Sequence, residues 1–142
     1  MTATEPRLLA TLYRGVSMTP TLRDGDVLLW RRNEGLPPVH AGDVVGFFED
    51  RRFIAHRVVR MDPGGAMATT RGDARLTADP PVLVNHIAYV AVAALRDGRP
   101  ISLDPSSSSV RLSSALLREA RRAAGALRRG ARRLASLRPP PA

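Results

Sequence analysis

The chain has 142 residues, 44% of them hydrophobic, and a net charge of +9, which fits one domain with its own core and a small appendage. It contains no cysteine, so disulfides, thiolate zinc sites and cysteine nucleophiles are excluded. All 22 positively charged residues are arginines, and the absence of lysine also excludes a lysine base.

The first 15 residues lack the basic start and long apolar run of a secretory signal. Elsewhere no stretch approaches the roughly 18 to 20 apolar residues that a membrane-spanning helix needs. We therefore expect a cytoplasmic protein.

Residues 1–104 are predicted to form a mainly β domain. Apolar and β-branched runs at 27–30, 44–48, 53–60 and 87–95 are separated by Gly, Pro and Asp. The Asp97-Gly98 pair favours positive φ and predicts a tight hairpin turn before a closing strand at 100–103. The pattern indicates a compact sheet or barrel.

The residues after 104 differ in character. Asp104-Pro105 and the serines at 106–109 break the strand pattern and predict a linker at 105–109, with serines that can cap a helix. Apolar residues then recur every three or four positions and predict one amphipathic helix at 110–137, which Pro139, Pro140 and Pro141 cannot continue. The apolar positions are Leu112, Leu116, Ala120, Ala123, Leu127, Ala131 and Leu134.

Most of the positive charge belongs to this last segment, 110–142, because residues 111–142 hold nine arginines and one glutamate. Such a helix can pack its apolar stripe on the domain, or it can lie at the surface of an anionic membrane with its arginines near the headgroups. Phosphates of a nucleic acid are a weaker candidate, because the segment has no aromatic platform and no recognisable reader motif.

Ser17 is the first candidate for chemistry, since it lies between a strand-like run and a turn that contains Pro20. A serine hydroxyl is a poor nucleophile at neutral pH and needs a base within hydrogen-bond reach, together with donors for the developing oxyanion.

Three other aspartates are expected to have structural roles. Asp24, Asp26 and Asp43 lie in R-D-G-D and A-G-D turns, where we expect their carboxylates to accept hydrogen bonds from backbone amides.

The segment GVSMTPTLRDGDVLL at 15–29 resembles the nucleophile box of the type I signal peptidase family, with Ser17 at the nucleophile position. Three further matches follow in the family's order: GDVV at 42–45, HRVV at 56–59 and RGD at 71–73. The histidine in the second of these resembles the endoplasmic-reticulum and archaeal branch, so the resemblance implies that His56 is the general base. An imidazole is largely neutral at pH 7 without deep burial.

An imidazole base gains from an acidic partner that fixes its tautomer, as in a Ser-His-Asp triad. Asp73 and Asp79 are the candidates. The resemblance to the histidine branch favours Asp79 as the partner of His56. Asp73 would then order the turn through side-chain bonds to backbone amides, a common role for aspartate after glycine, while the reverse assignment stays open. Neither a metal nor an organic cofactor is implied, and the three histidines of the chain are scattered.

The sequence departs from the family pattern at Ala74, where the family has asparagine, and at Ala88, where it has glycine. Gly15 also replaces a serine that donates to the oxyanion in some relatives, which leaves this role to the Ser17 amide. The implied fold is a set of bent antiparallel sheets, to which this chain adds a C-terminal helix.

The implied function is a serine endopeptidase that cleaves a signal or leader peptide. It would act in the cytoplasm, held at the inner face of the membrane by the basic helix. The alternative is a catalytically inactive peptide-binding module of the same fold, for which Ala74 and Ala88 are the best indications.

Overall fold

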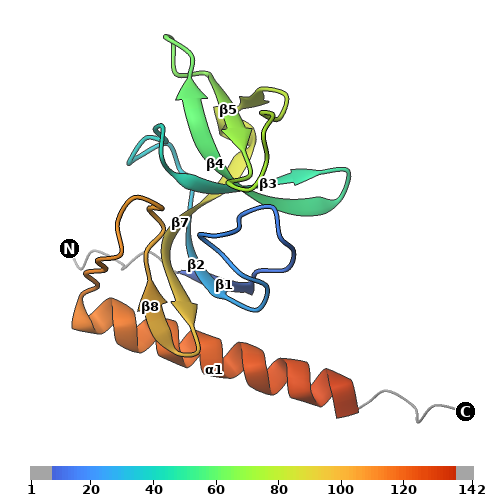
Figure 1. Ribbon diagram of the computed structural model, residues 1–142, viewed down its shortest axis with the longest axis vertical. Coiled ribbons are helices and arrows are strands. Elements are labelled where there is room, and N and C mark those ends of the chain that lie inside the picture. Colours follow the sequence, from blue (N-terminus) through green and yellow to red (C-terminus); the bar gives the residue numbers. More distant parts are fainter. Residues whose placement is uncertain (1–7, 137–142) are drawn as a thin grey trace, which may run out of the picture.

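A computed structural model describes the backbone of residues 8–136 and the side chains of residues 8–132. These residues form one antiparallel sheet of eight strands and a single C-terminal α-helix, which confirms the prediction of a mainly β protein (Figure 1). The elements are β1 (Leu9–Leu12), β2 (Val27–Arg32), β3 (Val44–Glu49), β4 (Arg52–Met61), β5 (Met67–Arg71), β6 (Val82–Leu83), the short 3₁₀ helix η1 (Val84–His86), β7 (Ile87–Arg96), β8 (Arg99–Ile101) and α1 (Ser114–Ser136).

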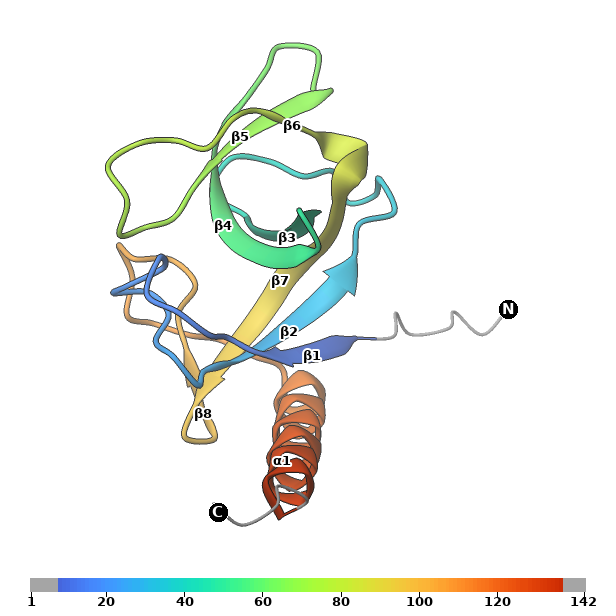
Figure 2. The ribbon, with the colours of Figure 1, turned by 90° about the vertical axis from the view of Figure 1, so that its right-hand side faces the viewer.

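The strands are ordered β1-β2-β7-β3-β4-β5-β6, and β8 pairs with β7 off this path. Register shifts interrupt the ladders between Leu29 and Trp30 of β2, and between Gly46 and Phe47 of β3. Such bulges bend a strand and increase its twist. Figure 2 shows the resulting curvature, which is strongest in β4. The loop between β1 and β2 and the loop between β5 and β6 come together on one side of the molecule.

The four longer predicted strands correspond to β2, β3, β4 and β7. The predicted hairpin turn is also present, with Asp97 at φ 52° and Gly98 at φ 75° between β7 and β8. The predicted strands did not include β5 or β6. β5 contains small and polar residues, and its Ala68 and Thr70 are buried through pairing with β4.

β2 has a continuous apolar run because both faces of the strand are buried. Val27 and Leu29 point into a cluster shared with α1, whereas Leu28 and Trp30 point into the cluster that contains the buried Met18. β2 therefore links the helix on one face to the serine loop on the other.

The helix begins later than predicted. It starts at Ser114 instead of residue 110, because the Ser113 hydroxyl accepts the Leu116 amide at 3.1 Å and caps the helix. Serines 106–109 are therefore not the cap, and residues 102–113 contain neither helix nor strand. The side chain of Leu134 and the proline-rich end at 137–142 lie outside the described residues.

The apolar stripe of α1 packs against the sheet next to β1 and β7 (Figures 1 and 2). Ala120 and Ala124 are buried there, and Leu116, Leu117 and Leu127 pack around them. The predicted stripe had Ala123 where the structure buries Ala124. Within residues 8–136, α1 is too polar to cross a membrane, and no other helix of sufficient length is present.

Candidate active site

Ser17 lies in the loop that joins β1 to β2, residues 13–26. Met18 and Leu22, on either side of the turn, are completely buried and fix this loop to the core. The Tyr13 amide donates to the Asp26 carbonyl at 2.8 Å, which closes the base of the loop. Ser17 is thus half-exposed on a loop that is anchored at both ends.

The aspartates of the turns accept backbone amides, as predicted. Asp24 accepts from Gly15 at 2.9 Å, Asp26 from Arg23 at 2.8 Å, and Asp43 from His40 at 3.0 Å. The bond from the Gly15 amide holds the pKa of Asp24 below its ordinary value. These carboxylates shape the loops and stay away from the chemistry described next.

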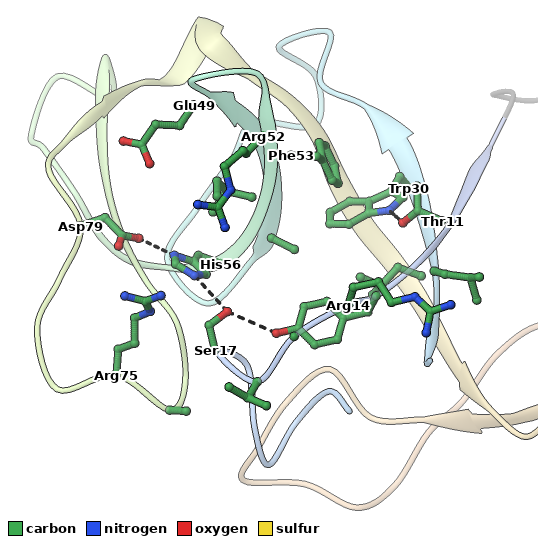
Figure 3. A pocket seen from close by; sticks show the side chains of 18 residues that line it. Thr11, Arg14, Ser17, Trp30, Glu49, Arg52, Phe53, His56, Arg75 and Asp79 are labelled. Atoms are coloured by element: carbon green, nitrogen blue, oxygen red, sulfur yellow. Dashed lines mark hydrogen bonds and ion pairs between the residues drawn. The ribbon is translucent and has the colours of Figure 1, made fainter. Parts of the chain in front are cut away.

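Three of the predicted site residues come together (Figure 3). The Nε2 atom of His56, on β4, lies 3.2 Å from Ser17 Oγ. The Nδ1 atom of the same ring lies 2.5 Å from Oδ2 of Asp79, which belongs to the loop between β5 and β6. The imidazole is buried, with 7% of its side chain exposed, and the Asp79 side chain is 24% exposed. This is the geometry of a Ser-His-Asp triad.

Asp79 is held by residues that the sequence analysis did not identify. The Thr70 hydroxyl donates to Oδ2 of Asp79 at 2.8 Å, and the Asp79 amide donates to the Thr70 carbonyl at 2.8 Å. Thr70 is completely buried. An ionised carboxylate can only accept, so Nδ1 of His56 is the donor to Asp79 and Nε2 of the neutral ring faces Ser17 as an acceptor.

Gly72 explains the glycine of the Arg-Gly-Asp motif. A Cβ atom at this position would lie 2.5 Å from the Ser17 carbonyl oxygen and 3.1 Å from Nε2 of His56. No larger residue fits without displacing Ser17 or His56. Two residues later, the Ala74 amide donates to the same Ser17 carbonyl at 2.9 Å. The serine loop and the Asp79 loop are therefore joined directly at the site.

Ser17 and His56 lie in a cleft with a volume of about 690 Å³. One wall is formed by residues 11–16, at the end of β1, and the other by residues 52–55 of β4. Trp30 contributes to the wall, and its ring contacts that of Phe53 edge-on, with centroids 5.4 Å apart. Phe53 packs so closely over Gly46 that a Cβ atom there would overlap with its ring.

Tyr13 is a further residue that the sequence analysis did not identify. Its hydroxyl oxygen lies 3.2 Å from Ser17 Oγ and accepts the Met18 amide at 3.0 Å. Neither Tyr13 nor Thr70 belongs to a recognisable catalytic spacing. Only the folded chain brings them beside Ser17 and Asp79.

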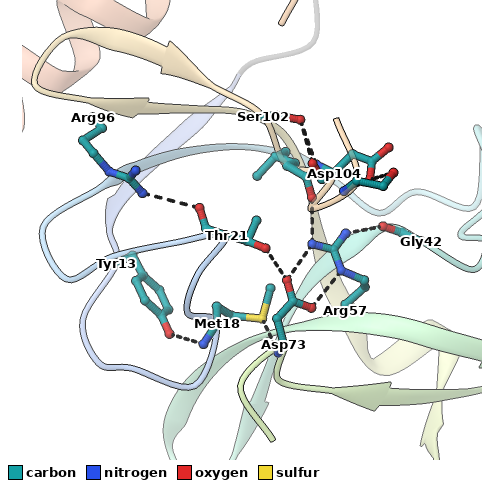
Figure 4. A network of polar contacts seen from close by, with 11 residues as sticks. Tyr13, Met18, Thr21, Gly42, Arg57, Asp73, Arg96, Ser102 and Asp104 are labelled. Carbon is teal, nitrogen blue, oxygen red and sulfur yellow. Dashed lines mark hydrogen bonds and ion pairs between the residues drawn. The ribbon is translucent and has the colours of Figure 1, made fainter. Parts of the chain in front are cut away.

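Asp73 does not join the triad (Figure 4). Arg57 donates to both of its carboxylate oxygens, at 2.9 and 2.8 Å, and the Thr21 hydroxyl donates to it at 2.5 Å. Partial burial alone would raise the pKa of Asp73, but the hydrogen bonds from Arg57 and Thr21 and the charge of Arg57 hold it below its ordinary value. We expected Asp73 to order its turn through backbone amides, and it acts instead through these side chains.

Replacing Asp73 with asparagine should destabilise the fold by about 3 kcal/mol at pH 7, because it leaves the Arg57 charge unpaired and almost buried. Since the folded pKa of Asp73 is lowered, its contribution is complete above the ordinary value of 3.8 and is lost as the pH falls through the folded value. Urea unfolding from pH 7 to pH 3 should show the difference between variant and wild type shrinking with acid.

The matched control for this prediction is Asp50→Asn, in the β3–β4 turn, where φ is 47° and asparagine fits well. It should leave stability almost unchanged. A difference between Asp73→Asn and wild type that stays constant down to pH 3 would contradict the assigned role of the Arg57 pair.

Among the described residues 8–136, no three His, Asp or Glu side chains are grouped in a way that could hold a metal ion. No protein-family model, no curated protein sequence and no solved structure matches this chain. The resemblance to type I signal peptidases therefore stays a prediction, carried by the four sequence motifs.

Proposed function

We propose that this chain is a serine endopeptidase that resembles signal peptidase I and cleaves a signal or leader peptide. The observation that carries the proposal is the contact of Ser17 with His56, and of His56 with Asp79, in a cleft of about 690 Å³. A serine in contact with a neutral imidazole, itself oriented by a carboxylate, is the arrangement that acyl transfer requires.

In the proposed reaction the Ser17 proton passes to Nε2 of His56 as Oγ bonds to the peptide carbonyl carbon. The tetrahedral intermediate then collapses, the C–N bond breaks, and the proton on Nε2 passes to the leaving amine. Water attacks the resulting ester and gives its proton to His56, which returns it to Oγ as the acid product leaves. Asp79 stays ionised and stabilises the imidazolium formed in each half of the cycle.

The strand edges beside the cleft support a peptide as the substrate. β1 is the end of the strand order, so one of its edges has no neighbour within residues 8–136. β5 pairs with β4 only from Arg57 onward, which leaves the β4 segment 52–56 without a partner on that side. An extended peptide can add to such an edge through backbone hydrogen bonds. The resemblance adds a preference for small residues just before the cleaved bond.

The second candidate is a peptide-binding module of the same fold that lacks turnover. Ala74 and Ala88 depart from the family pattern, and both candidates use the same cleft. The structure weakens the argument from Ala74, because the contact of this residue with Ser17 is made by its backbone amide. Retention of Ser17, His56 and Asp79 in contact favours the enzyme.

The experiment that separates the two candidates is incubation of the purified protein with libraries of leader-like peptides that have small residues before the cleavage site. Products are identified by mass spectrometry, with Ser17→Ala as control and with anionic vesicles present in a parallel series. Cleavage by the wild type alone supports the peptidase. Peptide binding without cleavage by either protein would favour the inactive module.

We also propose that α1 holds the enzyme at the cytoplasmic face of an anionic membrane. The apolar stripe of the helix already packs against the sheet, so the contact between the helix and the membrane would be electrostatic. At 100° per residue, the described arginines of α1 fall within an arc of about 120°. They are all exposed: Arg118, Arg121, Arg122, Arg128, Arg129 and Arg132.

Changing Arg118, Arg122 and Arg129 together to glutamate should weaken binding to vesicles that contain anionic lipid by at least about 100-fold, since each arginine near such a surface contributes about 1 kcal/mol. Vesicle sedimentation measures the effect. Glutamates at Arg32, Arg51 and Arg60 make the same charge change on exposed residues of the sheet domain and should have a smaller effect. Equal losses in both variants would assign the binding to net charge.

A further inference from the structure

Tyr13 occupies an unusual place next to the nucleophile. It follows β1 directly, and only 6% of its surface is exposed. Ser17 Oγ has two partners in the site, the Tyr13 hydroxyl and Nε2 of His56. The oxygen lies 3.2 Å from Ser17 Oγ and also receives the Met18 amide at 3.0 Å.

One assignment of the protons lets every contact of this network be a hydrogen bond at the same time. Asp79 only accepts, so His56 donates from Nδ1, and Nε2 of the neutral ring can accept a proton from Ser17 alone. The Tyr13 oxygen already accepts from Met18, and Ser17 Oγ is the only acceptor for the Tyr13 proton within residues 8–136. Tyr13 therefore donates to Ser17, and the serine proton is directed at His56.

We propose that Tyr13 is a catalytic residue of this site, whose hydroxyl first directs the Ser17 proton toward His56 and then donates to the oxyanion of the tetrahedral intermediate. The inference rests on the proposed peptidase function and adds a second oxyanion donor to it. The first donor is the Ser17 amide, for which the described part of the chain offers no acceptor.

The geometry leaves room for this second role. The oxyanion is attached to the same carbon atom as Oγ, so a donor that touches Oγ is within reach of it. A Cβ atom built on Gly15 would meet only the Tyr13 oxygen, at 4.0 Å, and nothing else in the described residues. Gly15 also has φ of +116°, which side chains rarely adopt. The space beside the phenol thus stays open.

Tyr13 keeps its proton throughout the reaction. When the Oγ–C bond forms, the Ser17 proton moves to His56 and the carbonyl electron pair moves to the oxygen. The phenol hydrogen bond then shifts from Oγ to that oxygen. Collapse restores the carbonyl, breaks the C–N bond, and sends the His56 proton to the amine. Tyr13 contributes a hydrogen bond that strengthens as negative charge develops.

The test is Tyr13→Phe, which keeps the buried ring and removes only the hydroxyl. With a peptide that the wild type cleaves, kcat should fall by about 10²- to 10³-fold with little change in KM, the loss typical of one oxyanion donor. Tyr89→Phe is the matched control. It is the other tyrosine of the chain, and its hydroxyl makes no hydrogen bond within residues 8–136. Tyr89→Phe should keep wild-type kcat.

A merely structural role for Tyr13 is tested in the Ser17→Ala background, by measuring peptide affinity with and without Tyr13→Phe. Equal affinities support catalysis, whereas an affinity loss as large as the loss of kcat/KM overturns it. A Tyr13→Phe enzyme with kcat within threefold of wild type also overturns the inference and leaves the peptidase proposal standing. If the wild type neither cleaves a peptide nor is labelled at Ser17 by a fluorophosphonate, both the peptidase proposal and the inference about Tyr13 are wrong.

Discussion

Replacing Ser17 with alanine is expected to lower kcat for cleavage of its peptide by at least about 10⁴-fold, because no other group can form the acyl-enzyme. His56→Gln should have an effect of similar size, since glutamine cannot take the serine proton. The two residues act as one unit, so the double variant should be no slower than either single variant. The measurement is single-turnover cleavage followed by mass spectrometry.

The control for this series is Ser108→Ala, an exposed linker serine that does not line the cleft. It should retain wild-type activity. Circular dichroism should be the same for the wild type and the four variants, because Ser17 and His56 lie at the cleft and their replacement leaves the core clusters intact. Cleavage that persists in Ser17→Ala would mean that the nucleophile has been assigned wrongly.

Asp79→Asn should reduce kcat by about 10⁴-fold while leaving the fold in place. The carboxamide can donate to His56 and favours the tautomer with the proton on Nε2, which cannot accept from Ser17. Thr70 contacts the same Oδ2 position as His56, and its hydroxyl oxygen can accept the second hydrogen of the new amide group, so stability should change less than activity. Activity and urea unfolding are measured on the same preparation.

Asp73→Asn is the matched comparison, because it makes the same chemical change six positions earlier in the same loop. It should lower stability and retain most of the activity at temperatures where the variant is folded. If the roles of the two aspartates were reversed, Asp73→Asn would lose activity and Asp79→Asn would lose stability. The pair of variants thus decides the assignment that the sequence left open.

The sequence predicted the long strands because their apolar and β-branched runs are bounded by turn residues, as in β2 and β7. It did not predict β5, whose buried Ala68 and Thr70 have no pattern of their own and depend on pairing with β4. The helix start was also placed wrongly, since several serines can serve as caps and only the packing of the helix selects Ser113.

The sequence also predicted part of the candidate site, but through a resemblance to a family rather than through a residue pattern. Spacing alone does not relate Ser17 to His56, and the resemblance to a family supplied their pairing with Asp79. Tyr13 and Thr70 were missed, and Gly72 was noted only as part of the Arg-Gly-Asp motif, because the importance of these residues lies in contacts rather than in residue type. Gly72 illustrates this, as its lack of a side chain matters only once the Ser17 carbonyl lies 2.5 Å from where Cβ would be.

The position of the site within the strand order has a consequence for how activity depends on folding. The nucleophile comes from the loop between β1 and β2, at one end of the order, and the acid comes from the loop between β5 and β6, at the other. Bonds between these loops, such as that from the Ala74 amide to the Ser17 carbonyl, assemble the triad. Release of either end of the sheet would abolish the proposed activity while most strands stayed paired, so such an activity would measure closure of the whole domain.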